Sequence, residues 1–79
     1  MNLSSILVIT STQNFDTTIE ALVAIDGLEV HHCDQASGRI IVTQESTNVA
    51  AEITGLRRIK SLPYVVLAEM VYHYCENDE

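Results

Sequence analysis

Apolar side chains recur along the chain with two alternating periods, one typical of strands and one typical of helices. Residues 6–9 form a short, mostly β-branched apolar run, which predicts a buried strand. The next apolar positions recur at helical spacing, so residues 16–25 are expected to form an amphipathic helix. These positions are Phe15, Ile19, Leu22 and Val23. Gly27 is expected to end this helix, since glycine takes a left-handed C-terminal conformation without steric penalty.

The second part of the chain begins with a predicted hairpin. Residues 28–31 alternate apolar and polar side chains and predict a strand that continues to Cys33 or Asp34. Residues 39–43 contain Ile-Ile-Val and predict the next strand. Residues 35–38 read Gln-Ala-Ser-Gly, which is typical of a turn, so the two strands should be antiparallel neighbours.

A second helix and a final strand complete the chain. The helix is expected to begin after capping side chains, which are Ser46, Thr47 and Asn48. Its buried stripe is predicted to be Val49, Ile53 and Leu56. Its C-terminal end, where the helix dipole favours cations, carries Arg57, Arg58 and Lys60. Pro63 forbids further helix, and residues 64–74 form the longest predicted strand.

The predicted order of elements is β-α-β-β-α-β, which is the split βαβ arrangement of ferredoxin-like domains. Such an α+β fold has a four-stranded antiparallel sheet with both helices on one face. Right-handed crossovers place the first and third strands at the centre of the sheet and the other two at its edges. We expect residues 1–79 to form a single ferredoxin-like domain with a short, acidic, disordered tail at about 75–79.

The strand period of two separates side chains that face the helices from side chains on the opposite, open face. The set predicted to face the helices is Ile6, Val8, Val30, Ile40, Val42, Val66, Ala68, Met70 and Tyr72. The set predicted for the open face is Leu7, Ile9, Glu29, His31, Arg39, Ile41, Thr43, Val65, Leu67, Glu69, Val71 and His73. Its apolar centre is unusual for a solvated face, so we predict that these residues bind a peptide.

The free energies of apolar contacts and of exposed ion pairs indicate what kind of peptide this face would bind. Burying one aliphatic side chain contributes about 1.5–3 kcal/mol, whereas an exposed carboxylate–arginine pair contributes about 0–1 kcal/mol. Apolar contact should therefore supply most of the affinity, and Glu29 and Glu69 should add steering and register. The expected ligand is an apolar or amphipathic peptide bearing arginines, either as a helix on the sheet or as an added edge strand.

Charge and composition narrow the function and location. The net charge is −7 with only four basic residues, which argues against nucleic acid as a partner because phosphate contacts need clustered cations. The apolar run of residues 6–9 is too short to cross a membrane, and no basic residue precedes it as in a secretory signal. We therefore expect a cytoplasmic protein without membrane insertion.

Residues 31–33 read His-His-Cys, a group that suggests a metal site. In a regular strand, however, His31 and Cys33 share one face and His32 lies on the other. His73 is expected on the opposite edge strand, about three interstrand spacings or ~14 Å away. We therefore expect no metal, no cofactor and, since no nucleophile can be placed against a base, no enzymatic activity. The roles of Cys33 and Cys75 stay open.

Three segments resemble one known family. Residues 67–73 read Leu-Ala-Glu-Met-Val-Tyr-His and are similar to the final strand of the NapD family, the small cytoplasmic chaperones of periplasmic nitrate reductase. Residues 37–42, preceded by Leu-Glu-Val at 28–30, resemble the central hairpin of that family, and residues 5–8 resemble its first strand. Tyr74-Cys75 and Leu62-Pro63-Tyr64 depart from the family pattern.

This resemblance implies both a fold and a function. NapD proteins are ferredoxin-like, and they bind the twin-arginine signal peptide of the nitrate reductase catalytic subunit. Binding holds back export by the Tat system while the molybdenum cofactor is inserted. A signal peptide of this kind is apolar, helix-prone and arginine-bearing, which is the ligand chemistry expected from the open face.

Three alternatives remain open on sequence grounds. The open face could instead pack against a second copy of the chain in a weak homodimer. A related alternative is a regulatory module that dimerises through its sheet and binds a small effector, although the chain has no Gly-rich loop suited to holding one. A metallochaperone is a third alternative, but the chain lacks the paired cysteines that such a protein uses.

Overall fold

A computed structural model describes residues 2–75 of the chain, and the side chains of residues 2–73. Its elements are β1 (Asn2–Thr10), a 3₁₀ turn η1 (Thr12–Asn14), α1 (Phe15–Val23), β2 (Leu28–Asp34), β3 (Arg39–Ser46), α2 (Val49–Lys60) and β4 (Val65–Cys75). This order confirms the predicted β-α-β-β-α-β sequence of elements. The expected acidic tail lies, apart from Cys75, outside the described residues.

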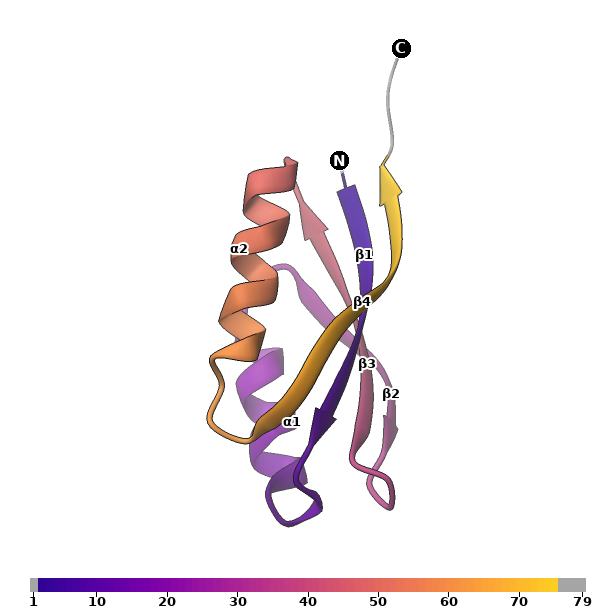
Figure 1. Cartoon of the computed structure of the whole chain (residues 1–79), viewed down its shortest axis with the longest axis vertical. Coiled ribbons are helices and arrows are strands. Elements are labelled where there is room, and N and C mark those ends of the chain that lie inside the picture. The colour runs from indigo at the N-terminus through magenta and orange to yellow at the C-terminus, as the bar shows by residue number, and fades with distance from the viewer. Residues whose placement is uncertain (1, 76–79) are drawn as a thin grey trace.

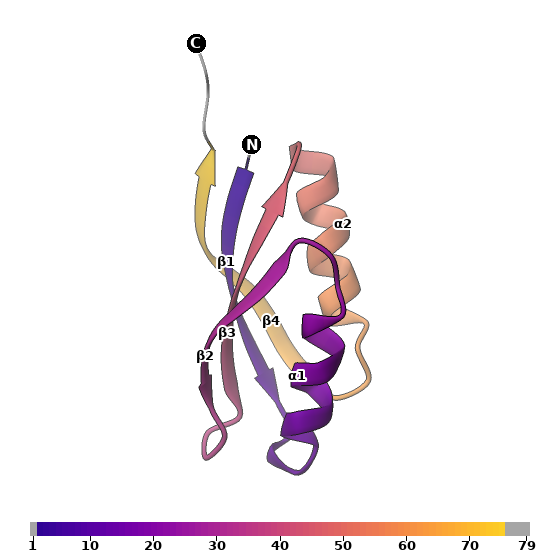
Figure 2. The same ribbon diagram turned by 180° about the vertical axis from the view of Figure 1, so that it is seen from behind.

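The strands form one antiparallel sheet in the order β2-β3-β1-β4, as predicted. Figures 1 and 2 show that α1 and α2 lie on the same side of this sheet, and no helix of residues 2–75 lies on the other side. The fold is therefore the ferredoxin-like α+β fold. The core lies between sheet and helices and consists of Ile6, Val8, Phe15, Leu22, Leu28, Ile40, Val42, Ile59 and Ala68.

The two central strands follow the predicted alternation closely. Ile6 and Val8 of β1 are fully buried, and so are Ile40 and Val42 of β3. The residues between them point to the open face, because directly paired positions such as Leu7 and Ile41 share a side of the sheet. A period of two therefore predicts the faces of residues 6–9 and 39–43 correctly, although β1 begins earlier and β3 ends later than expected.

Strand β4 does not follow the predicted alternation, because two bulges interrupt its pairing with β1. Each bulge adds one residue to β4 without a partner on β1, first at Val66 and again at Val71. Val66 and Tyr72 were expected to face the helices, but they are 74% and 56% exposed. Tyr72 instead pairs opposite Ser5, which places its side chain on the open face.

The same bulges move two predicted open-face residues to the helix side. Val65 pairs opposite the buried Thr10 and packs against the core. His73 pairs opposite the buried Ser4 and contacts α2. For these two residues the predicted face was wrong, because each bulge exchanges the faces of the residues beyond it.

A third bulge lies in β2 at His31. Val30 pairs with Val42, and the next pair joins His32 to Ile41, so His31 is the additional residue. His32 therefore lies on the open face, whereas Cys33, opposite Ile40, belongs to the helix side. The prediction that His31 and Cys33 share a face was wrong for this reason.

Helix α1 ends at Val23, two residues earlier than predicted, and it buries Thr18 whereas Val23 is exposed. Val23 is 62% exposed, whereas Thr18 is 1% exposed. The Thr18 hydroxyl donates to the Asn14 carbonyl at 2.8 Å and lies 2.9 Å from the Thr10 hydroxyl. These contacts satisfy the buried oxygen, so Thr18 can occupy an inward position.

Helix α2 is rotated relative to the predicted stripe. Asn48 caps it by accepting a hydrogen bond from the Ala51 backbone NH at 2.8 Å, as its sequence position indicated. Val49 and Ile53 are 55% and 47% exposed, so their predicted burial was wrong, whereas Leu56 does pack against the core. The fully inward positions are Glu52 and Ile59.

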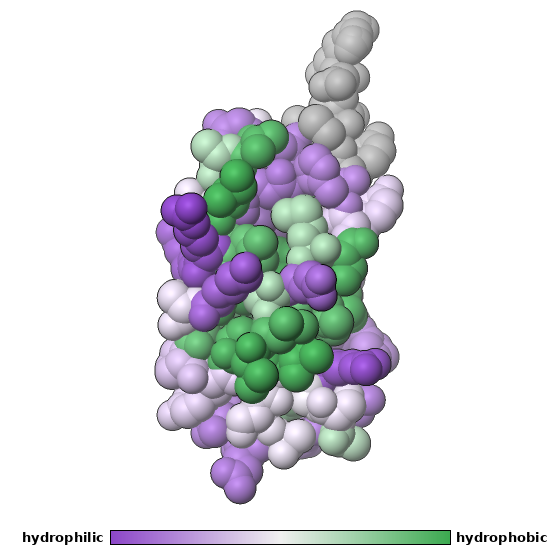
Figure 3. Space-filling view, in the orientation of Figure 1, coloured by the Kyte–Doolittle hydropathy of each residue, from purple (hydrophilic) through white to green (hydrophobic). Residues whose placement is uncertain are grey.

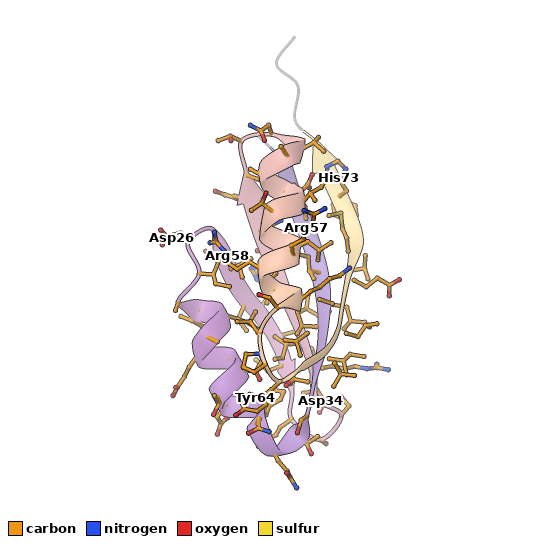
Figure 4. The ribbon with its side chains drawn as sticks, turned by 60° about the vertical axis from the view of Figure 1, so that its left-hand side comes forward. Asp26, Asp34, Arg57, Arg58, Tyr64 and His73 are labelled. Atoms are coloured by element: carbon orange, nitrogen blue, oxygen red, sulfur yellow. The ribbon has the colours of Figure 1, made fainter. Side chains whose placement is uncertain are left out.

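A buried polar cluster explains why Glu52 faces the sheet. The Ser4 hydroxyl donates to Glu52 Oε2, and His73 Nε2 lies 3.1 Å from the same oxygen. The Gln44 side chain donates to the Glu52 carbonyl at 3.2 Å. This cluster joins α2 to β1, β3 and β4, and Figure 4 shows His73 on β4 beside the helix.

Gly55 allows α2 to approach the sheet at this cluster. A Cβ at this position would lie 1.9 Å from Gln44 Oε1 and 2.7 Å from Gln44 Cδ. Gln44 is itself buried and bonded to Glu52, so its side chain has little freedom to move away. The glycine, which lowers helix propensity by about 1 kcal/mol, is therefore explained by close packing.

Substituting Ser4 by alanine should destabilise the fold, because the buried Glu52 carboxylate loses a donor. We expect the free energy of unfolding to fall by about 1.5–3 kcal/mol, measured by urea denaturation. Ser5→Ala is the matched control on the opposite face of the same strand, and it should cost less than about 0.5 kcal/mol. Equal losses for the two variants would contradict the proposed role of the cluster.

Gly55→Leu should destabilise the fold by about 1–3 kcal/mol, because the larger side chain must displace Gln44 from its bond to Glu52. Thermal and urea unfolding both measure this loss. Ala50→Leu adds the same side chain at an exposed position of α2 and should stay within about 0.5 kcal/mol of the wild-type chain. A fully stable Gly55→Leu protein would show that α2 does not pack as closely as described.

Candidate functional site

The open face of the sheet is built from three rows of side chains that cross all four strands. One row joins Tyr72, Ser5, Thr43 and Glu29. The middle row joins Glu69, Leu7, Ile41 and His32. The third row joins Leu67, Ile9, Arg39 and Asp34. Because no helix lies on this side, the three rows can contact a partner directly.

The centre of the open face is apolar. Leu7, Ile9 and Ile41 are half-buried by their neighbours in the sheet, and Leu67 beside them is 41% exposed. Val71 and Tyr72 extend this apolar area along the edge strand β4. In a solvated sheet face these positions would be mainly polar, so the pattern is typical of a surface that another molecule covers.

Acidic side chains surround the apolar centre. Glu69 lies on the β4 edge, Glu29 and Asp34 lie on the β2 edge, and Glu45 lies opposite Leu3. A hollow of about 270 Å³ at one corner is lined by Gly27, Leu28, Glu29, Thr43 and Glu45. Arg39 supplies a positive charge opposite Asp34. The surroundings of the apolar centre are therefore mostly negative and favour a cationic ligand.

Hydrogen bonds fix the β2 side of the face. His31 Nε2 lies 2.9 Å from the Thr43 hydroxyl and 3.2 Å from Glu29 Oε1. These contacts bring three predicted residues together across the β2–β3 pair. His31 is the additional residue of the β2 bulge, and its ring lies on the open face beside Glu29 and Thr43.

The structure brings most predicted site residues together on this face. The exceptions are Val65 and His73, which lie on the helix side. Val71 is the additional residue of a bulge and is exposed at the β4 edge of the face. Sequence reasoning missed Ser5, His32, Asp34 and Tyr72, which the register places on the face. No sequence signal indicated them: Ser5 precedes the predicted strand at residues 6–9, and the other three lie beyond bulges in β2 and β4 that the pattern of apolar and polar side chains does not reveal.

A second exposed apolar area lies along α2 and β4. Val49 and Ile53 on the helix and Val66 on the strand are 47–74% exposed. Figure 3 shows hydrophobic side chains gathered over α2 and over part of β4. This area lies on the helix side of the β4 edge, and its charged neighbours include basic side chains, with Lys60 beside Val66 and Arg57 in the last turn of α2. It is therefore less suited to a cationic ligand than the open face.

The described side chains offer little for chemistry. No group of three histidine, cysteine, aspartate or glutamate side chains converges within the part of the chain that the structure describes. In the cluster of Ser4, Glu52 and His73, the carboxylate lies between the hydroxyl and the imidazole. The imidazole is therefore not held against the hydroxyl as a general base would be, and Ser4 is fully buried.

No helix among the described residues is long and apolar enough to span a membrane. Arg57 and Arg58 are exposed on α2, on the helix side of the sheet, with Arg57 toward β4 and Arg58 toward α1 (Figure 4). The charged side chains of the open face therefore come from the strands, and among them acidic residues outnumber basic ones.

Comparisons with known proteins show the family of this chain and agree with its fold. A family model described as "NapD protein" matches residues 1–77. The solution structure of the E. coli Tat proofreading chaperone protein NapD superposes with a TM-score of 0.85 at 25% sequence identity. That match covers 98% of this chain and 81% of the E. coli chain. Comparison with curated protein sequences gave no significant match. The family match over nearly the whole chain and the shared fold together show that this chain belongs to the NapD family.

Proposed function

We propose that this chain is a chaperone that binds the twin-arginine signal peptide of the catalytic subunit of periplasmic nitrate reductase. The observation that carries the proposal is the open sheet face, which combines an apolar centre with a mostly acidic surround. The similarity to a Tat proofreading chaperone supports the same class of ligand. The binding residues we propose are Leu7, Ile9, Glu29, His31, Arg39, Ile41, Thr43, Leu67, Glu69 and Val71.

Apolar contact supplies most of the affinity in this proposal. Burying a fully exposed aliphatic side chain contributes about 1.5–3 kcal/mol, so covering what remains exposed of Leu7, Ile41 and Leu67 would supply the largest favourable contribution to binding. Each exposed charge pair adds about 0–1 kcal/mol. The acidic side chains then orient the peptide by its arginines and raise the rate of encounter.

The geometry of the edges favours a peptide that lies across the face over one that adds a strand. Strand β4 is bulged at Val66 and Val71, and β2 is bulged at His31. Bulges twist an edge and interrupt the ladder that an added strand would need. A helical signal peptide would instead place one apolar stripe on the centre of the face and leave its arginines at the acidic surround.

Holding the signal peptide in this way would keep the precursor from the Tat export machinery. The catalytic subunit would then remain in the cytoplasm while its molybdenum cofactor is inserted. In this proposal the chain binds and releases a peptide in the cytoplasm and performs no chemistry of its own.

Replacing Leu7 or Leu67 by aspartate should abolish peptide binding while preserving the fold. The new carboxylate would have to be desolvated against an apolar peptide segment, and we expect the Kd to rise by at least about tenfold. Calorimetric titration with a synthetic twin-arginine signal peptide measures the change, and circular dichroism checks the fold.

Val23→Asp is the matched control for this experiment. It places the same charge at a valine that is 62% exposed on α1, on the helix side of the sheet. This variant should bind the peptide as the wild-type chain does. Undiminished binding by Leu7→Asp and Leu67→Asp, or an equal loss in Val23→Asp, would count against the open face as the site.

A further inference from the structure

Tyr72 and Glu69 are neighbours on the β4 edge of the open face. Glu69 pairs opposite Leu7 and Tyr72 pairs opposite Ser5, two positions further along β1. Positions with this separation on one face are about 7 Å apart, a distance that long and aromatic side chains can bridge. Tyr72 is 56% exposed and Glu69 is also exposed, so both can reach a ligand.

The orientation of Tyr72 is fixed by the residues beside it. Val71 is the additional residue of the bulge, and His73 on the other side of Tyr72 contacts Glu52 at 3.1 Å. Turning Tyr72 toward the helices would remove His73 from the Glu52 carboxylate. The same polar cluster that joins α2 to the sheet therefore keeps an aromatic ring on the open face.

Among the acidic residues in the rows of the face, Glu69 is the one with no histidine or arginine in contact with it or directly opposite it. The Glu29 carboxylate lies 3.2 Å from the His31 ring, and Asp34 lies directly opposite Arg39. Glu69 lies opposite the aliphatic Leu7 and makes no ion pair with the described side chains. Its carboxylate is therefore available to a cation that arrives with a ligand.

A carboxylate beside an exposed aromatic ring is suited to a guanidinium group. The carboxylate can accept two parallel hydrogen bonds from the planar fork, and the ring face attracts the delocalised cation. A lysine ammonium has no fork and is more strongly hydrated, so it would use such a site less well.

We propose that Glu69 and Tyr72 form a guanidinium subsite that takes one arginine of the bound signal peptide. This inference rests on the proposed function and deepens it, because it assigns one arginine of the ligand to one edge of the face. The apolar part of the peptide then lies over Leu7 and Ile41, and His73 and Glu52 act as positioning residues that hold Tyr72 in place.

The test is a calorimetric comparison of a synthetic twin-arginine signal peptide with versions in which each arginine is replaced by citrulline or lysine. Citrulline preserves the shape of arginine and removes its charge. With the wild-type chain, citrulline at one of the two positions should weaken binding by about threefold to tenfold, and lysine at that position should be intermediate. With the double variant Glu69→Gln, Tyr72→Leu, the same peptides should bind within about twofold of one another.

A charge-matched control uses Glu20→Gln, which removes one exposed carboxylate from α1 on the helix side. This variant should keep the full preference for arginine over citrulline.

A separate variant, Glu52→Gln, tests the positioning role of the buried cluster. It should displace Tyr72 and thereby reduce the preference for arginine over citrulline. A change in the NMR shifts of the Tyr72 ring without added peptide would report that displacement.

The outcomes separate this inference from the proposed function. If the wild-type chain does not bind the arginine peptide, the proposed function fails. If it binds and prefers arginine but the double variant keeps that preference, the subsite is wrong and the peptide-binding function stands. If the wild-type chain binds arginine and citrulline peptides equally, the subsite is likewise overturned.

Discussion

A side chain in a β-strand can point to only one of two faces, and in this fold the two helices cover only one of them. Ile6, Val8, Ile40 and Val42 supply the covered face, and the residues between them supply the other. Because the intervening residues include Leu7, Ile9 and Ile41, the uncovered face is apolar at its centre. The proposed function follows from this arrangement, since an apolar area without an internal cover is available to a foreign peptide.

The second constraint is the buried polar cluster around Glu52. A carboxylate that is 3% exposed needs donors, and it obtains them from Ser4 on β1 and His73 on β4. These partners fix how α2 lies on the sheet, which Gly55 permits by leaving room for Gln44. They also fix the register of β4 beyond its second bulge, so Tyr72 is placed on the open face. Packing on the helix side of the sheet thus determines which side chains, such as Tyr72, lie on the open face.

The central part of the molecule could be predicted from the sequence because its pattern is regular. The order of elements, the strand order and both faces of β1 and β3 follow from a period of two and from short turns. The edges could not, since the bulges at His31, Val66 and Val71 have no distinct local signature, and each exchanges the faces of the residues beyond it. The stripe of α2 was mispredicted for a related reason: hydrophobicity favours Val49 and Ile53 as inward residues, but the partners that allow Glu52 to be buried lie far away in the sequence.

We propose that the signal peptide lies on the helix-free face of the sheet. Intermolecular nuclear Overhauser effects between an unlabelled twin-arginine peptide and the methyl-labelled chain would locate the peptide. Peptide protons should then contact the methyl groups of Leu7, Ile9, Ile41 and Leu67. Contacts to Val23, Val49 or Ile53 in place of these would contradict this proposal, because those side chains are exposed on the helices.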